Sequence, residues 1–163
     1  MGFMMRKILL FLSSVLLFSF SFAQEYKQFY EYLIDLDGWK GSQPSGQYTK
    51  TFMGELLKVE RNYTKQNQSL KVQIIKGGIV MMMWMPFSMV VEQDTPEKFL
   101  KTTQIEGFKS AIEHNKKDNS GKILMMVAPN AAFILEYSGI KDYNQAVEIV
   151  KKFPLKKISM KLM

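Results

Sequence analysis

Two runs of alternating residues in the first half of the sequence constrain the fold most strongly. In residues 55–64, the side chains of Leu57, Val59 and Tyr63 alternate with polar neighbours, and residues 69–76 alternate in the same way. A period of two is typical of β-strands with one buried face. Only the polar residues 65–68 separate the runs, which suits a hairpin and leaves no room for a crossover helix. The sequence therefore predicts an antiparallel sheet.

Further strand patterns occur before and after these runs. Residues 47–52 predict a short strand, and Glu106-Gly107 is expected to form a two-residue hairpin turn between strands at 103–105 and 108–113. The segments 122–128 and 132–137 are apolar on both faces, which is typical of central strands covered on each side.

Helix signals lie mainly at the two ends of the mature chain. Residues 25–37 place apolar side chains at helical spacing, and Asp142 is expected to cap a last helix over 143–153. Thr95-Pro96-Glu97 predicts a further short helix over 97–102. The patterns together favour a single α+β domain over 24–163. We expect a mainly antiparallel sheet of about six to seven strands with N- and C-terminal helices packed on one face.

The first 23 residues have the three parts of a cleavable export signal. Arg6-Lys7 precede an apolar stretch at 8–20, and Ser21-Phe22-Ala23 place small residues three and one before a cleavage point at Gln24. The apolar stretch is shorter than the roughly 20 residues that a membrane anchor needs. We therefore expect export to the periplasm or the exterior of a bacterium.

Composition excludes several chemistries. The chain has no Cys and one His, so disulfides, thiolate metal sites, Cys nucleophiles and two-His iron sites are excluded. That residue, His114, lies beside a charged loop and is expected to be exposed. No G-x-S-x-G motif and no phosphate-binding glycine pattern occurs. We expect a protein without catalytic function or cofactor, and its export argues against nucleic acid as a partner.

A hydrolase is the enzymatic alternative, and it would depend on His114 or on carboxylates beside loops. Asp35 and Asp37 precede the first loop, and Glu92 and Asp94 precede the second. Glycosidases need two carboxyl groups about 5 to 10 Å apart, a distance that spacing in sequence does not supply. Acids in such places are commonly caps or dipole partners.

The segment 79–91 (IVMMMWMPFSMVV) is the most unusual in the chain, because five of its residues are Met. Methionine fills cores and builds surfaces that accept varied partners. We therefore expect this segment to be the contact surface of an exported binding protein for an apolar ligand or protein. The expected contact residues are Trp39, Met81, Met83, Trp84, Met85, Phe87 and Met89.

An alternative function is a Cu(I)- or Ag(I)-binding protein, since thioethers are soft ligands that suit these ions. Its ligands would be Met81, Met83, Met85 and Met89. On a helix Met81, Met85 and Met89 share one face, whereas on a strand Met81, Met83 and Met85 do. The sequence leaves open whether 79–91 is a helix, a strand or a mobile flap.

Basic residues gather near the C-terminus, where five lysines occur within eleven residues that contain no acid. Two interpretations are open. They form a solvated basic tail, or they contact an anionic surface of the cell envelope. The lysines are Lys151, Lys152, Lys156, Lys157 and Lys161.

Several landmarks together resemble a loose group of small exported bacterial proteins of unknown function. They are Asp37-Gly38-Trp39 with Gly41, Gly77-Gly78, the Met-rich segment, Ile105-Glu106-Gly107-Phe108, and residues 127–139 before the last helix. The resemblance implies a periplasmic or surface location and no defined activity. The end of the leader, Phe22-Ala23-Gln24, is similar to those common in Bacteroidetes.

Overall fold

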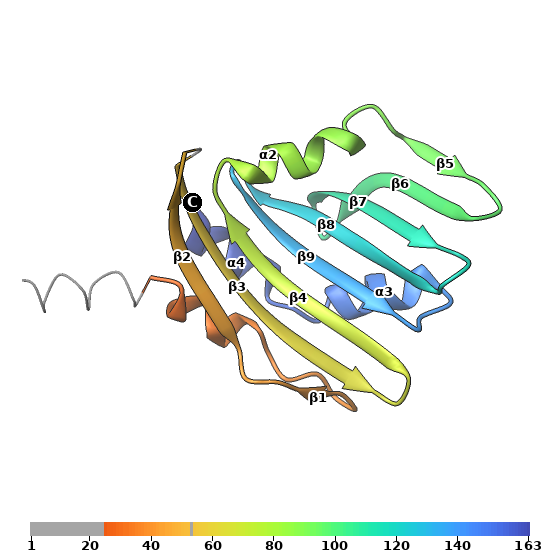
Figure 1. Cartoon of the computed structure of the whole chain (residues 1–163), viewed down its shortest axis with the longest axis horizontal. Coiled ribbons are helices and arrows are strands. Elements are labelled where there is room, and N and C mark those ends of the chain that lie inside the picture. Colours follow the sequence, from red (N-terminus) through yellow and green to blue (C-terminus); the bar gives the residue numbers. More distant parts are fainter. Residues whose placement is uncertain (1–24, 53) are drawn as a thin grey trace, which may run out of the picture.

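The computed structural model describes residues 25–52 and 54–163, so the expected leader and its cleavage point before Gln24 lie outside the described residues. In chain order the elements are η1 (Lys27–Tyr32), β1 (Lys40–Gly41), β2 (Ser45–Thr51), β3 (Gly54–Lys65), β4 (Gln68–Lys76), α2 (Ile79–Trp84), η2 (Met85–Phe87), β5 (Glu92–Asp94), β6 (Lys98–Ile105), β7 (Phe108–Asn115), β8 (Ser120–Ala128), β9 (Ala131–Ser138), α3 (Tyr143–Val150) and α4 (Leu155–Leu162). The strands form one open antiparallel sheet, shown in Figure 1, with the order β1-β3-β4-β9-β8-β7-β6-β5 and with β2 also paired to β3.

The pairing of β4 with β9 joins the two halves of the chain. Val72 lies opposite Leu135 and Ile74 opposite Phe133, so the centre of the sheet is built from strands distant in sequence. Strand β9 lies between β4 and β8, and β8 lies between β9 and β7. The expectation that 122–128 and 132–137 form central strands is therefore confirmed.

Two hairpin turns follow from local residue chemistry. At the β6–β7 turn, Ile105 pairs with Phe108, and Glu106 and Gly107 have φ angles of 52° and 84°. Positive φ at both central positions is typical of a type I′ turn, which glycine favours. The predicted hairpin at Glu106-Gly107 is confirmed. The β3–β4 connection is similar, with Lys65 opposite Gln68 and a φ of 53° at Gln66.

The larger core lies on one face of the sheet, under the helical segments from both ends of the chain. Side chains from η1, α3 and α4, such as Phe29, Ile149 and Ile158, are buried there against the inward residues of β3, β4, β8 and β9. Ser159 of α4 also donates a hydrogen bond of 2.6 Å to the carbonyl oxygen of Val127 in β8. Figure 1 shows α3 and α4 behind the sheet.

The opposite face of the sheet is divided into an apolar half and a charged half. Helix α2 and η2 cover the apolar half, where a second buried cluster includes Ile75, Leu124 and Ile134. Glu60 lies in the charged half, where Lys58 contacts its carboxylate at 2.7 Å and Gln73 donates to it at 3.0 Å. The hydrogen bond from Lys58 is the main reason that the pKa of Glu60 is lowered. This half therefore needs no cover.

The fold is α+β, as expected, but the sheet has nine strands rather than six to seven. The two strands that the sequence missed, β1 and β5, have two and three residues. Segments this short do not show alternation, and their pairing with β3 and β6 is decided by neighbouring strands.

The helix expected over 25–37 is instead the short 3-10 helix η1, which ends at Tyr32. Side chains of β3 take the carbonyl groups that a longer helix would use. Arg61 donates to the carbonyl oxygen of Leu33 at 2.6 Å, and Tyr63 donates to that of Ile34 at 2.8 Å. Tertiary contacts thus override the helical spacing of the sequence.

The helix expected over 97–102 is also wrong, since these residues lie in β6 and the turn before it. The backbone N–H of Thr95 donates to the carbonyl oxygen of Lys98, and the Thr95 hydroxyl accepts from the N–H of Lys98. Proline suits the second position of a β-turn as well as the first position of a helix, so Thr95-Pro96 was ambiguous.

The C-terminal residues form helices rather than a basic tail. Asp142 caps α3 by accepting the N–H of Asn144 at 2.8 Å, and α3 ends at Val150 rather than at Phe153. Pro154 then begins α4, which the sequence did not predict. Proline is tolerated at a helix start, so Pro154 both prevents α3 from continuing and permits a new helix after it.

Candidate functional site

The candidate site is the segment of α2, η2 and the loop that follows, and its inner side fixes it to the sheet. Val80, Trp84 and Phe87 are buried at a spacing of four and three residues, which places them on one helical face. They pack against the apolar half of the open face. The segment 79–91 is therefore helical at its start, because that half of the sheet supplies a surface for one apolar helix face.

The outer side of this segment is apolar as well. Met81, Met82 and Met85 are between 54% and 68% exposed, and Met89 in the loop is 94% exposed. Their sulfur-bearing chains extend away from the sheet, while Met83 is half-buried and packs against the inner cluster. The structure thus separates the methionines of the cluster into an outer group and Met83.

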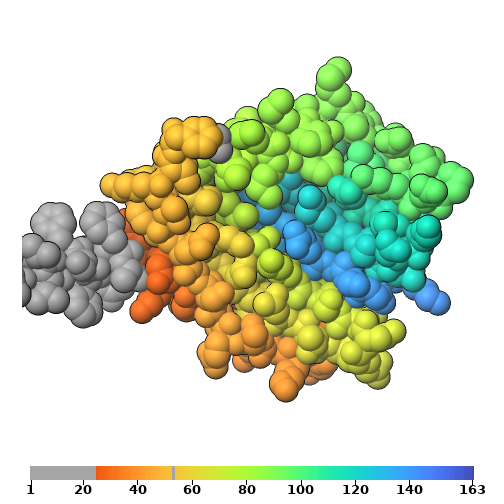
Figure 2. Space-filling model, viewed as in Figure 1, coloured from red at the N-terminus to blue at the C-terminus, as the bar shows by residue number. Residues whose placement is uncertain are grey.

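A second element adds to this exposed apolar surface. Phe52, in the turn between β2 and β3, is 97% exposed. Gly77, just before α2, lies close to the backbone of Glu55 and Leu56 at the start of β3, so the turn and the start of α2 lie at the same end of these strands. Figure 2 shows the end of β2 and the start of β3 beside α2. We call these side chains the apolar rim: Phe52, Met81, Met82, Met85, Met89 and Val91.

Two lysines lie beside α2 and η2, whereas residues 77–91 contain no ionisable side chain. The ammonium nitrogen of Lys109 lies 4.6 Å from the centre of the Trp84 ring, and that of Lys122 lies 5.9 Å from the centre of the Phe87 ring. Both distances permit cation–π attraction. Lys76, in contrast, lies on the face of the larger core, where it lines a cavity of about 410 Å³ with Phe29, Leu57 and Lys161.

The Trp84 indole N–H is buried without a hydrogen-bond acceptor among the described residues. Leaving a buried donor unpaired costs about 1–3 kcal/mol. The ring itself contacts Phe87, with 6.1 Å between ring centres. Trp84 is thus held by packing and by the cation of Lys109, and its polar atom contributes nothing to the attachment.

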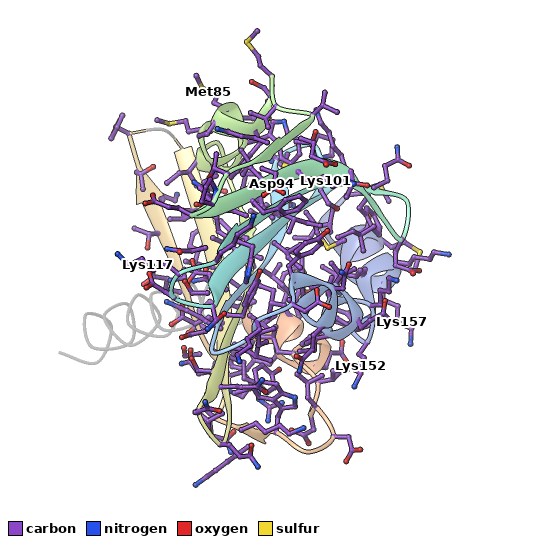
Figure 3. All side chains as sticks on the ribbon, turned by 90° about the vertical axis from the view of Figure 1, so that its right-hand side faces the viewer. Met85, Asp94, Lys101, Lys117, Lys152 and Lys157 are labelled. Carbon is purple, nitrogen blue, oxygen red and sulfur yellow. The ribbon has the colours of Figure 1, made fainter. Side chains whose placement is uncertain are left out.

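Two groups of predicted site residues lie apart from the rim. Trp39 is half-buried and packs against the larger core, with the ammonium of Lys65 5.9 Å from its ring centre. The lysines near the C-terminus belong to the end of α3 and to α4, on the face opposite α2. Figure 3 shows Met85 on one side of the sheet and Lys152 and Lys157 on the other. The structure therefore does not bring Trp39 or these lysines to the Met segment.

His114 was expected to be exposed, but it is buried in β7. Its Nδ1 lies 3.0 Å from the hydroxyl of Tyr137, and burial lowers the pKa of the imidazole. Register explains the difference, because Gly121 of β8 lies opposite both His114 and Tyr137 and brings them together. No Ser, Thr or Lys side chain has a hydrogen bond with His114 among the described residues.

Three of the four loop carboxylates form ion pairs with the chain's own cations. Asp35 pairs with Arg61 at 2.5 Å, Glu92 pairs with Lys101 at 3.0 Å, and Asp94 pairs with Lys116. Within 25–52 and 54–163, no group of three or more His, Cys, Asp or Glu side chains is placed to hold a metal ion.

Sequence reasoning missed Met82, Phe52 and Val91 as members of the rim. The spacing of Val80, Trp84 and Phe87 was the available signal, because it places Met82 outward with Met81 and Met85. Phe52 gave no such signal, since it is an isolated aromatic residue at the end of a strand. Its position beside α2 depends on the pairing of distant segments.

Comparisons with family models, with curated protein sequences and with solved structures give no significant match to this chain. Among the described helices, none combines the length and the apolar character needed to cross a membrane.

Proposed function

We propose that this chain is an exported, non-catalytic binding protein that contacts an apolar partner surface through the apolar rim. The single observation that carries the proposal is the exposed outer side of α2. Among the described residues, five of the eight exposed large apolar side chains lie between 81 and 91. Exposed apolar side chains that gather in one patch, rather than singly, mark interaction sites.

The fold itself does not require these methionines. Val80, Trp84 and Phe87 already cover the apolar half of the sheet, and they are buried. Met81, Met82 and Met85 keep more than half of their surface in water, so they contribute little hydrophobic stabilisation. Flexible thioether chains adapt to partners of varied shape, which suits a contact surface.

Photo-crosslinking in the native host tests this proposal. The chain, expressed with its own leader, carries a photoreactive phenylalanine derivative at position 85 or, as a control, at position 160. Met160 is 66% exposed and lies on α4, on the opposite face of the sheet. We expect a crosslinked product at position 85 and none at position 160. Equal yields at the two positions would remove the support for a contact surface at α2.

A second candidate function, Cu(I) or Ag(I) binding, is favoured by one specific observation. Met81 and Met82 are exposed on α2, Met85 is exposed at the start of η2, and Met89 follows in the loop. Thioethers are soft ligands for these ions. Met83 packs against the sheet, so Met82 takes its place in the proposed ligand set.

Native mass spectrometry of the processed protein with Cu(I) separates the two candidates. Changing Met81, Met82, Met85 and Met89 to Leu keeps the surface apolar but removes the sulfur ligands. The metal function predicts stoichiometric uptake that these changes abolish. The contact function predicts no such uptake. It also predicts that a chain with the probe at position 85 and the changes M81L, M82L and M89L gives the same crosslink as the chain with the probe alone.

Location and the basic helices complete the proposal. The charged start, apolar stretch and small residues of 1–23 support export to the periplasm or beyond. Lys156, Lys157 and Lys161 are exposed on α4, where they can meet an anionic envelope polymer. That contact would lie on the face opposite the apolar rim, so one molecule could bind two partners.

A further inference from the structure

We propose that the surface bound by the apolar rim is an anionic phospholipid bilayer, which the protein contacts from outside without crossing it. This inference rests on the proposed function, since it names the partner of the same site. The rim side chains enter the boundary between headgroups and acyl chains. Lys109 and Lys122, beside α2 and η2, remain at headgroup level and pair with lipid phosphates.

The shape of the rim suits a fluid apolar phase. Its members come from the β2–β3 turn, from α2, from the start of η2 and from the loop that follows, and each is more than half exposed. The most exposed of them, Phe52 and Met89, have almost no protein neighbours around their side chains. A rigid protein partner would need a separate pit for each projecting chain. Acyl chains rearrange around all of them at once.

Charge distinguishes a bilayer from a second copy of the chain. Lys109 and Lys122 form no ion pair with a carboxylate among the described residues. Two copies meeting through their rims would bring these cations together, and like charges repel. An anionic lipid surface supplies the opposite charge, and each lysine near it strengthens binding roughly fivefold.

Lys122 lies opposite Glu113 and Glu136 in the sheet, whereas Lys109 lies opposite Gln104. The two acids at the border of the rim, Glu92 and Glu55, do not offset the charge of Lys109. Glu92 pairs with Lys101 at 3.0 Å. Glu55 lies 3.9 Å from Lys50, and its hydrogen bond with Tyr48 helps to raise the pKa of that phenol to about 12. Both carboxylates therefore have partners of their own. The surface that faces the bilayer combines apolar side chains with unpaired lysines, which is the composition of interfacial membrane anchors.

Co-sedimentation with vesicles tests the inference, using protein that the host has processed and whose N-terminal residue is verified by mass spectrometry. Vesicles of equal parts phosphatidylglycerol and phosphatidylcholine are compared with vesicles of phosphatidylcholine alone. We expect binding to the anionic vesicles that weakens in about 0.5 M salt, because screening there acts over a few ångströms. We expect binding to the neutral vesicles to be at least about tenfold weaker, from the contribution of two lysines.

Three sets of substitutions assign the contacts. The M81Q/M82Q/M85Q variant should bind anionic vesicles at least about tenfold more weakly, since apolar insertion is lost. K109Q/K122Q should lose most of the preference for anionic lipid. M81L/M82L/M85L should bind like the unchanged protein, which separates apolar insertion from metal binding. M160Q is the matched control and should bind normally, and circular dichroism verifies that each variant is folded.

The outcomes separate this inference from the proposed function. If the unchanged protein does not bind anionic vesicles, or binds both vesicle types equally, the bilayer is not the partner. The proposed function then survives if the probe at position 85 crosslinks a protein. A second outcome is that the unchanged protein binds anionic vesicles, but M81Q/M82Q/M85Q and M160Q bind them with equal affinity. In that case the rim is not the membrane contact, and the inference is wrong.

Discussion

Arg61 offers a sharp test of how the chain before the sheet is held in place. Its guanidinium donates to the carbonyl oxygen of Leu33 at 2.6 Å, to that of Ser42 at 2.8 Å and to the Asp35 carboxylate at 2.5 Å. The Arg61 side chain is 13% exposed, whereas that of Asp35 is 92% exposed. We predict that the two carbonyl bonds, rather than the ion pair, provide most of the stabilisation.

The magnitudes follow from burial and geometry. A hydrogen bond from a charged donor contributes about 1.5–3 kcal/mol, and an exposed ion pair contributes about 0–1 kcal/mol. Lysine keeps the charge, but its single nitrogen cannot reproduce a planar fork that reaches two separate carbonyl groups. Arg61→Lys should therefore lower the free energy of unfolding by about 2 kcal/mol. Asp35→Asn should lower it by less than about 0.5 kcal/mol.

Urea unfolding followed by circular dichroism measures both values under the same conditions. An unchanged slope of free energy against urea concentration would verify that the difference reflects native contacts rather than a new unfolded state. A loss below about 0.5 kcal/mol in Arg61→Lys would refute the carbonyl argument. Equal losses in the two variants would mean that the ion pair with Asp35 is the main interaction.

Three further predictions concern buried positions. Burial lowers the pKa of His114 below its ordinary value of 6.5, so the unfolded chain takes up the proton first as pH falls. The free energy of unfolding should decrease below about pH 6.5, by at most about 1.4 kcal/mol per pH unit until the folded-state pKa is reached, and His114→Phe should remove this step in urea titrations at several pH values. Gly121→Ala should destabilise by about 3 kcal/mol in thermal unfolding, because a Cβ there would overlap the Glu113 carbonyl oxygen and the Tyr137 hydroxyl. Trp84→Phe should change the stability by less than about 1 kcal/mol in urea unfolding, because losing an unpaired N–H offsets the lost packing.

The parts of the fold that the sequence predicted well are those decided by local chemistry. Alternation over 55–64 and 69–76 predicted β3 and β4, and Glu106-Gly107 predicted a turn with positive φ. The parts that failed depend on partners distant in sequence. His114 is buried because the register of β7, β8 and β9 places Tyr137 beside it. The helix over 25–37 stops early because Arg61 takes a carbonyl group that the helix needs.

The candidate site shows the same division between local pattern and distant contacts. The sequence singled out the Met-rich segment, but it did not predict which methionines face water. That choice depends on the apolar half of the sheet, which is assembled from β4, β6, β7, β8 and β9. Once Trp84 is placed against the sheet, helical geometry directs Met82 outward and Met83 inward. One buried residue of α2 would have been enough to assign the others.

The division of the open sheet face supports the proposal that the rim contacts a partner. Its charged half is self-sufficient, because Glu60 is paired with Lys58 and bonded by Gln73, and solvent can cover it. The apolar half of the face is not self-sufficient, and one side of the short helix α2 covers it. A helix that only served as a cover would need polar residues on its outer side to remain soluble. Here that outer side is Met81, Met82 and Met85. Since neither the sheet nor the helix needs apolar side chains there, the outer methionines are best explained by a surface outside the molecule.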